Sequence, residues 1–367
     1  MNTLYQVKNK TLKITSEYSR DGMRSRLSVR RSSHSMSALV CGLDVHKEST
    51  YATILDQDGE IVTQKRMPNE EVPDFLKPHP VKRVAMEAST SIAPLYRKLV
   101  DEGYQVTVSH PRKTRYIAEA RIKSDRVDSK ALAELLRLNS LPESYMPPPH
   151  IAVLREKVRR RAFLVRQRTK LKVKIRDVLT YEGVKPPKEY GLYTLKGRKW
   201  LEGLGMESIL CYLRVMETLR EEIHRLSLEL RHIAAGDEDV RLLMTVPGVG
   251  YYIALLVKAE VGDIDRFHSG DHLASYAGIV PSTHSSGKVT RHGRITREGS
   301  AWLRWAMVEA VLVHLRYDTP VTRLYHRVAE RRGCKTARVA AARKLLTVCW
   351  SVLRNRRPYY NPVHAQA

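Results

Sequence analysis

The sequence predicts an α/β domain followed by a mainly α-helical region. Short apolar runs alternate with helical patterns after an opening hairpin, which favours an α/β sheet over a sandwich. A Pro-rich break at residues 142–149 precedes long leucine stripes with three- and four-residue spacing, which are typical of helices. The 367 residues, 43% hydrophobic and 28% charged, predict two or three folded domains. We expect a basic, disordered extension at 1–37, an α/β domain at 38–148, a helical arm at 149–236, a helical C-terminal domain at 237–357 and a tail at 358–367.

The extension at 1–37 is basic and rich in serine, and it has no apolar segment of the kind found in secretory signals. Two interpretations stay open: an arm that touches nucleic acid, or a start codon assigned too early. The second is favoured because Met36 directly precedes the first strand-like run.

Within the α/β domain, a strand over 38–55 and a returning strand over 60–67 flank the hairpin turn Asp58-Gly59, so that the first strand carries Asp44. An N-cap at Ser124 predicts the start of the last helix of the domain. The remaining elements are strands at 83–87 and 105–109 and helices at 72–76, 92–103, 111–120 and 124–138.

In the helical region, apolar residues recur at three- and four-residue steps over 152–179 and 208–235, which predicts an antiparallel coiled-coil arm. The C-terminal domain opens with Pro247-Gly-Val-Gly250 before an apolar helix. This motif resembles a helix-hairpin-helix turn, whose backbone N–H groups suit a phosphate, and a plain tight turn explains it equally well.

The charge is strongly basic: 64 Lys and Arg against 39 Asp and Glu give a net charge of +25. Such a surplus indicates a polyanionic partner, of which nucleic acid is the commonest and an anionic membrane surface the alternative. The excess is concentrated at 155–176, with eleven cations and one acid, and at 316–357, with twelve cations and two acids. The region 40–128 is nearly balanced by comparison.

The cysteines and the apolar stretches exclude other classes. Four cysteines lie far apart without CxxC spacing, so we expect free thiols in a reducing cytoplasm rather than a zinc ribbon or a disulfide framework. The longest uncharged stretch, 242–257, is shorter than the ~20 residues of a membrane-spanning helix and contains Pro247. We therefore expect no membrane segment.

Four acids of the first domain are candidate catalytic residues. Asp44 lies in an apolar strand and Glu87 ends another, while Asp125 and Asp128 are three apart, on one face of a helical turn. Carboxylates so placed repel one another, and Mg²⁺, which prefers oxygen ligands, would remove that cost. For Asp125 and Asp128 alone, neutralisation by neighbouring Lys and Arg on a solvated face is the more probable explanation.

Serines of the third segment lie among cations. Ser285 and Ser286 precede Gly287 in an expected loop that also carries Lys288 and Arg291. A serine there is able to attack a phosphodiester if its alkoxide is stabilised, although a basic loop whose serines only hydrogen-bond phosphates is the simpler interpretation of the residues alone.

Taken in order, these segments resemble the insertion-sequence one-ten family of transposases, DEDD/serine recombinases of bacterial insertion sequences. The resemblance covers about residues 39–357. Its matching segments are Gly42-Leu-Asp-Val-His-Lys47, Met86-Glu87-Ala88, Lys123-Ser-Asp-Arg-Val-Asp-Ser-Lys-Ala-Leu132, Val246-Pro-Gly-Val-Gly250, Ala277-Gly-Ile-Val-Pro281, Ser286-Gly287 and Arg294-Ile-Thr-Arg-Glu-Gly-Ser-Ala-Trp-Leu-Arg304.

The resemblance implies an RNase H-like, RuvC-like first domain in which Asp44, Glu87, Asp125 and Asp128 bind Mg²⁺. It also implies that Ser286 attacks DNA and forms a 5′-phosphoserine link, with Ser285 as the alternative nucleophile. The implied partners are DNA, a non-coding bridge RNA and further copies of the chain, as dimers that pair into tetramers, in a bacterial cytoplasm at the nucleoid. The candidate nucleic-acid-binding residues are Lys170, Lys172, Lys174, Lys288, Arg291, Arg294, Arg297 and Arg304.

Two rival functions stay open. A RuvC-like nuclease that cuts with metal-activated water would need the four acids but not Ser286. A catalytically inactive nucleic-acid-binding protein would need neither set. The chain differs from the resembling family at two positions: Arg297 stands where Lys is common, and Ser300 stands where Asn is common. Neither residue takes part in the implied chemistry.

Overall fold

The structure is a computed structural model that describes residues 6–7, 10–11, 39–117, 124–286 and 289–359; the side chains at 6–7, 10–11, 116 and 283–292 lie outside that description. The chain divides into two compact units, 1–146 and 147–367, and the division falls inside the Pro-rich break. Most of the expected disordered extension and of the expected tail lies outside the described residues. Within the extension, the short strands β1 (Gln6–Val7) and β2 (Lys10–Thr11) pair antiparallel.

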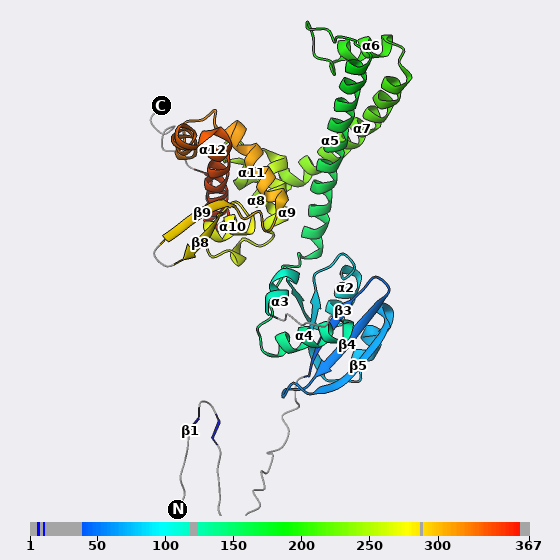
Figure 1. Cartoon of the computed structure of the whole chain (residues 1–367), viewed down its shortest axis with the longest axis vertical. Helices are drawn as coiled ribbons and strands as arrows, with labels where there is room; N and C mark the ends of the chain where they lie inside the picture. Colours follow the sequence, from blue (N-terminus) through cyan, green and yellow to red (C-terminus); the bar gives the residue numbers. More distant parts are fainter. Residues whose placement is uncertain (1–5, 8–9, 12–38, 118–123, 287–288, 360–367) are drawn as a thin grey trace, which may run out of the picture. The chain divides into compact units, whose positions relative to one another are not determined.

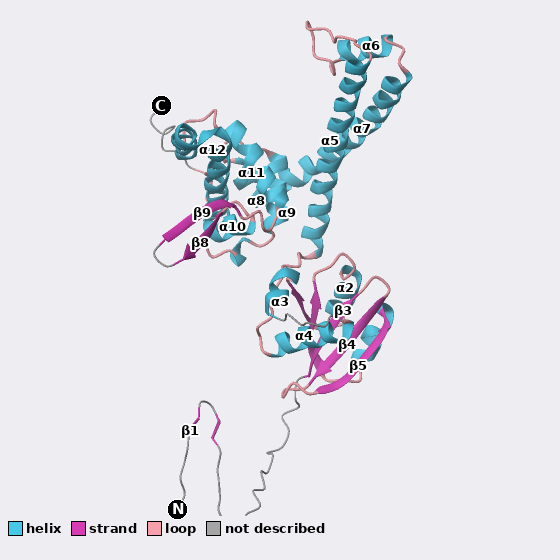
Figure 2. Ribbon diagram, viewed as in Figure 1, coloured by secondary structure: helices cyan, strands magenta, loops and turns pink. Residues whose placement is uncertain are grey.

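The first unit contains a five-stranded mixed sheet with the strand order β5-β4-β3-β6-β7 (Figures 1 and 2). The strands β3, β4 and β5 pair antiparallel in succession, whereas β6 pairs parallel with β3 and β7 pairs parallel with β6. This mixed sheet agrees with the RNase H-like, RuvC-like domain that the resemblance implies. The strands are β3 (Leu39–Val45), β4 (Ser49–Leu55), β5 (Ile61–Pro68), β6 (Val81–Glu87) and β7 (Gln105–Ser109).

The prediction of one strand over 38–55 is wrong. The segment forms two antiparallel strands, β3 and β4, with a turn between them at which the His46 N–H donates to the Ser49 carbonyl over 2.9 Å. The Asp58-Gly59 turn therefore joins β4 to β5, and Asp44 lies on the strand before that hairpin. The turn at 46–48 contains no Gly or Pro, so the local sequence gives no turn signal.

Helices cover both faces of the sheet. Alternate residues of β3 point to opposite faces: Cys41 and Leu43 belong to the larger core with α1 and α2, whereas Val40 packs against α4. The helix expected at 72–76 has these bounds, and those expected at 92–103 and 124–138 are present with slightly shorter ends. The part of 111–120 beyond 117 lies outside the described residues. The helices are η1 (Asn69–Glu71), α1 (Val72–Leu76), α2 (Ala93–Asp101), α3 (Pro111–Ile117) and α4 (Asp125–Arg137).

Gly42 allows α4 to lie directly on β3. A Cβ atom at this position would lie 2.1 Å from the Ser129 carbonyl oxygen and 2.5 Å from the Ala133 nitrogen, both of them backbone atoms of the helix. A buried hydrogen bond of 2.7 Å between the hydroxyls of Thr53 and Ser129 ties the same helix to β4. The missing side chain therefore fixes how close α4 comes to the sheet.

Two long helices of the second unit pack antiparallel (Figure 1). Near one end, Ile175 and Leu179 of the first share a core cluster with Ile209 of the second; near the other end, the Lys157 Nζ lies 2.5 Å from the Glu229 Oε1. The helices are α5 (Pro149–Tyr181), α6 (Leu195–Gly203) and α7 (Glu207–Gly236).

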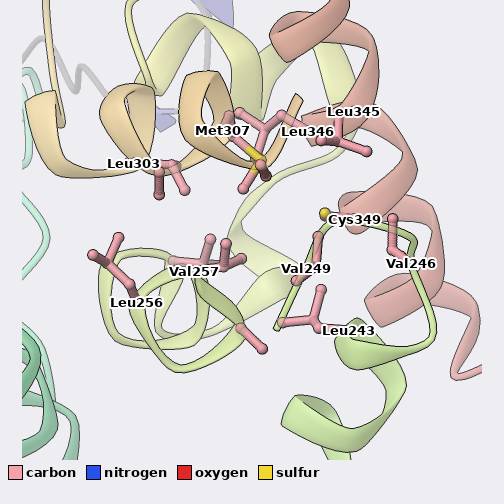
Figure 3. Close-up of a cluster of buried hydrophobic side chains, with 14 of the residues drawn as sticks. Leu243, Val246, Val249, Leu256, Val257, Leu303, Met307, Leu345, Leu346 and Cys349 are labelled. Atoms are coloured by element: carbon pink, nitrogen blue, oxygen red, sulfur yellow. The ribbon is translucent and has the colours of Figure 1, made fainter. Parts of the chain in front are cut away.

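The C-terminal helices surround a separate apolar core with contributions from α5 and α7. Figure 3 shows part of it, where Leu243, Val257, Leu303, Met307 and Leu346 meet. The elements are α8 (Glu238–Met244), α9 (Tyr251–Val261), η2 (Ile264–Arg266), α10 (Gly270–Tyr276), β8 (Pro281–Ser286), β9 (Val289–Ile295), α11 (Ala301–His314) and α12 (Pro320–Asn355), which is interrupted at Gly333.

The predicted Pro-Gly-Val-Gly turn connects α8 and α9. Gly248 has a φ of +84°, and a Cβ atom there would lie 2.5 Å from the Ala310 carbonyl oxygen of α11. His314, also on α11, is fully buried beside this turn. Its Nδ1 lies 2.7 Å from the Pro247 carbonyl oxygen and donates to it, because a carbonyl only accepts. In the neutral ring the Nε2 then accepts, and it does so from the Thr319 hydroxyl over 2.7 Å. The neutral imidazole thus links the turn to the start of α12.

The cysteines are free thiols, as their spacing predicts. Cys41 and Cys349 are buried, and Cys211 and Cys334 are exposed. Burial raises the pKa of the Cys349 thiol to about 12. Among the described residues, none of the helices combines the length and the apolar character needed to cross a bilayer.

Replacing Gly42 by Ala is expected to destabilise the first unit by about 2–3 kcal/mol, because a methyl group there overlaps backbone atoms of α4, so the helix must shift away from the sheet. Calorimetric unfolding of the full chain measures the shift. The matched control is Gly203→Ala in α6, where no atom lies within 4 Å of the added Cβ. Equal effects of the two substitutions would contradict the close contact.

His314 predicts a loss of stability in mild acid. Burial lowers the pKa of the imidazole, so below the ordinary value of about 6.5 the unfolded chain binds a proton that the folded chain does not. Stability is therefore highest above that pH and falls as the pH decreases towards the lowered folded pKa. Unfolding midpoints measured between about pH 8 and 5 should fall more steeply for the wild type than for His314→Gln. Parallel curves would show that His314 is not the responsible group; His224→Gln, an exposed position on α7, is the control.

Candidate active site

Two of the predicted acids lie at the same edge of the sheet because their strands are parallel neighbours. Leu43 of β3 pairs with Met86 of β6, so Asp44 and Glu87 are the next residues along the two strands. Residues matched in this way on adjacent strands present their side chains to the same face. The Asp44 side chain is 18% exposed. The pairing of the sheet therefore brings two carboxylates together.

The other two acids enter from the first turn of α4. Ser124 is the N-cap, and its hydroxyl accepts from the Val127 N–H; Asp125 and Asp128 follow it. Carboxylates are stabilised at this end of a helix by the unpaired N–H groups and the macrodipole. Because α4 packs on β3 at Gly42, its first turn lies beside the end of that strand.

His46 lies between acids of the two elements. Its Nε2 is 3.4 Å from the Asp44 Oδ2 and 3.4 Å from the Asp125 Oδ1. A more distant cation, the Arg66 Nη2, lies 4.0 Å from the Asp125 Oδ2. One ligand atom from each of Asp44, His46 and Asp125 lies within 4.8 Å of the others. This donor set fits a divalent cation.

The electrostatics of Asp44 show that all four acids are neighbours. Burial is the largest influence and raises the pKa of its carboxyl group; His46 opposes that rise, and the charges of Asp125, Asp128 and Glu87 add to it. Ionisation of Asp44 is therefore less favourable in the folded chain than in the unfolded one. The structure brings the four acids together, although they come from three separate segments of the sequence.

Asn69 holds the turn that carries His46. Its Nδ2 donates to the carbonyls of His46 and Lys47, each over 3.1 Å, and its Oδ1 accepts from the Thr50 hydroxyl over 2.6 Å. Asn69, Thr50 and Arg66 were not among the residues predicted for this region. The signal that the sequence offers for this region is His46, which follows Asp44 by two residues at the end of a strand.

The predicted nucleophile lies at the end of β8, in a hairpin rather than an open loop. Ser286 pairs with Val289 and Ser285 pairs with Thr290, both in the antiparallel β8–β9 pair. Lys288 lies outside the described residues, as do the side chains of Ser285, Ser286 and Arg291.

The backbone pairing of this hairpin continues beyond its two strands, towards the helices that flank it. The Thr296 N–H donates to the Val280 carbonyl over 3.0 Å, and the Arg297 N–H donates to the Gly278 carbonyl over 3.1 Å. The Ser300 hydroxyl then caps α11 and donates to the Glu260 Oε2 over 2.8 Å. Glu260, buried with 1% of its side chain exposed, also accepts two hydrogen bonds from Arg159 of 2.8 and 2.9 Å.

The predicted nucleic-acid-binding cations divide into exposed and engaged groups. Lys170, Lys174, Arg294 and Arg297 are exposed. Lys172 lies 4.8 Å above the Tyr193 ring, and burial lowers the pKa of its ammonium group, as do neighbouring Arg168 and Arg176. The Arg304 Nη1 donates to the Ala277 carbonyl over 2.7 Å. The exposed group is the more accessible to phosphates, and within it Lys174 also lies 3.8 Å from the Asp177 Oδ2.

Comparison with known proteins gives the following matches. Residues 41–182 match a family model of IS110 DEDD transposases, described as Transposase, and residues 240–327 match the model Transposase IS116/IS110/IS902 family. The chain is 28% identical over 339 residues to the transposase for insertion sequence element IS1111A of Coxiella burnetii, a match that covers 87% of this chain and 91% of that one.

Further relatives include a probable family 20 transposase of Pseudomonas aeruginosa, 27% identical over 345 residues, covering 88% of this chain and 98% of the relative. A pilin gene-inverting protein of Moraxella bovis is 36% identical over 142 residues, covering 37% and 41% of the two chains. The solved structure of T. thermophilus RuvC in complex with Holliday junction substrate is 10% identical and covers 29% of this chain and 99% of that one, with a TM-score of 0.24.

Replacing Asp44 by Asn is expected to stabilise the metal-free protein. The raised pKa of Asp44 means that its ionised form costs folding free energy at neutral pH, and the amide keeps the shape without the charge. In EDTA, the gain should be on the order of 1 kcal/mol, as is usual when repulsion at a functional site is relieved. Thermal unfolding measures it. Asp58→Asn in the exposed β4–β5 turn is the control, and a lower midpoint for Asp44→Asn than for that control would contradict the repulsion.

Proposed function

Because the chain belongs to the IS116/IS110/IS902 family of transposases, we propose that it cleaves and exchanges DNA strands through a covalent serine–DNA intermediate, with a metal-binding acidic tetrad. The observation that carries the proposal is the convergence of Asp44, Glu87, Asp125 and Asp128 on one edge of the sheet. Acids from three separate segments of the chain meet there, at a cost that a bound cation would offset.

The four acids would hold Mg²⁺, which prefers carboxylate oxygens. When bound, divalent ions in such a site stabilise the attacking and leaving oxygens of a phosphoryl transfer. Asp44 and Asp125 have the closest geometry, since both face the same His46 nitrogen. Glu87 and Asp128, whose charges act on Asp44, would add negative charge that attracts the cation.

Ser286 would be the nucleophile of the second unit, with Ser285 as the alternative. In the proposed step, the Ser286 Oγ bonds to a DNA phosphorus as its proton passes to solvent, and the bond from that phosphorus to the 3′ oxygen breaks. The 3′ oxygen takes a proton from solvent and leaves as a hydroxyl, while the phosphorus stays on the serine as a 5′-phosphoserine ester. The family match over 240–327 includes this serine. The hydrogen bonds at the base of the β8–β9 hairpin support a fixed position for the strand that carries it.

The partners would be DNA and a bridge RNA, held by exposed cations such as Lys170 and Lys174 on α5, Arg294 on β9 and Arg297 just after it. A net charge of +25 supports polyanion binding. The antiparallel α5–α7 pair would form a coiled-coil arm for contacts between copies of the chain, as dimers that pair into tetramers. In that assembly, the acids and the serine of one composite site would come from different subunits.

A covalent-trapping assay tests the proposal. Full-length protein, Mg²⁺, RNA transcribed from the flanks of the element and end-labelled DNA are combined and separated on a denaturing gel. We expect a protein–DNA adduct that disappears in Ser286→Ala and persists in Ser285→Ala. Asp125→Asn should reduce strand transfer by at least ~10²-fold, the size usual for loss of one catalytic group, while DNA binding stays nearly unchanged.

Other outcomes would contradict the proposal. Cleavage without an adduct, still dependent on Asp44, would indicate a RuvC-like nuclease that uses water. DNA binding with normal strand transfer in Asp125→Asn would remove the acids from the mechanism. An adduct lost only in Ser285→Ala would move the nucleophile by one residue.

A further inference from the structure

His46 has a position that the acidic tetrad alone does not explain. Its Nε2 is equally far, 3.4 Å, from an oxygen of Asp44 and an oxygen of Asp125. A charge-assisted hydrogen bond to either carboxylate would be shorter, about 2.7–2.9 Å. The nitrogen thus faces the space between the two oxygens instead of donating closely to one of them.

The spacing suits a common ligand sphere. Adjacent ligands of an octahedral ion with bonds of about 2.1 Å lie roughly 3 Å apart, and opposite ones lie roughly 4.2 Å apart. The two nitrogen–oxygen distances of 3.4 Å are close to the first value, and the three ligand atoms lie within 4.8 Å of one another. Small rotations of the side chains would place all three around one cation.

The backbone at His46 is already fixed. The Asn69 side chain donates to the carbonyls of His46 and Lys47, and the His46 N–H donates to the Ser49 carbonyl. Because three hydrogen bonds hold this turn, the backbone from which the imidazole extends is fixed in position. Metal sites require ligands that are preorganised in this way. Arg66, at 4.0 Å from the Asp125 Oδ2, leaves the other oxygen of that carboxylate facing His46.

We propose that His46 is a direct nitrogen ligand of the metal, so that the centre combines an imidazole with carboxylates and prefers Mn²⁺ to Mg²⁺. This inference rests on the metal site of the proposed function and adds to it a ligand outside the four acids. Mn²⁺ shares with Mg²⁺ the preference for carboxylate oxygens, but as a first-row transition metal it also accepts an imidazole nitrogen, whereas Mg²⁺ takes oxygen ligands. A nitrogen ligand therefore changes the selectivity of the site as well as its affinity.

The test measures metal binding, not turnover. Mn²⁺ is titrated into full-length protein and followed by electron paramagnetic resonance, with Mg²⁺ as competitor, and pulsed spectra of the bound ion are searched for coupling to ¹⁴N. We expect ¹⁴N coupling in the wild type and in His150→Gln, an exposed control on α5. In His46→Gln we expect no coupling and a Mn²⁺ affinity reduced at least ~10-fold, with the Mg²⁺ affinity changed much less.

The failures are distinguishable. Bound Mn²⁺ without ¹⁴N coupling, or with the same coupling and affinity in His46→Gln, would overturn the role of His46 and leave the acidic metal site intact. Absence of Mn²⁺ binding in the wild type, with Asp44→Asn behaving identically, would overturn the metal site itself and the inference with it. Circular dichroism of each variant confirms that the chain is folded before its spectra are compared.

Discussion

The contact between strand β3 and the backbone of α4 at Gly42 is the constraint on which the first unit depends. Backbone atoms of the helix occupy the space where any side chain would begin, so the helix lies as close to the sheet as two backbones allow. That closeness brings the first turn of α4, with Asp125 and Asp128, to the end of the strand that carries Asp44. A wider gap would separate carboxylates that now share one small volume, and the electrostatic cost they impose would disappear together with their capacity to hold an ion.

In the second unit, the corresponding constraint is the position of the β8–β9 hairpin next to the helical core. Glu260 is a buried acid that receives two hydrogen bonds from Arg159 and one from Ser300. The carboxylate thereby links α5, α9 and the N-cap of α11. Buried ion pairs add little net stability, but breaking one leaves an unpaired charge inside the protein, so such pairs tend to fix a single arrangement. The strand carrying Ser286 begins next to this arrangement.

Much of the fold could be predicted from the sequence where local signals are strong. Ser124 marks the start of α4. The helices α1 and α2 and the strands β6 and β7 lie where apolar patterns place them. The strand over 38–55 was misjudged because its turn is held by the side chain of Asn69, which is distant in the sequence. Asp44 and Asp125 could be selected by residue type, but the place of His46 between them depends on how closely α4 packs, and no local pattern encodes that distance.

The four cysteines offer an experimental opportunity of another kind. Two of them, Cys41 and Cys349, are sealed in apolar cores, and burial raises the pKa of both thiols, so neither supplies a reactive thiolate under ordinary labelling conditions. Cys211 on α7 and Cys334 on α12 are exposed. The natural chain therefore accepts a fluorophore pair without mutagenesis, one on the long helical hairpin and one on the C-terminal helix. Energy transfer between these dyes would follow, in a single molecule, any bending of the second unit when nucleic acid binds.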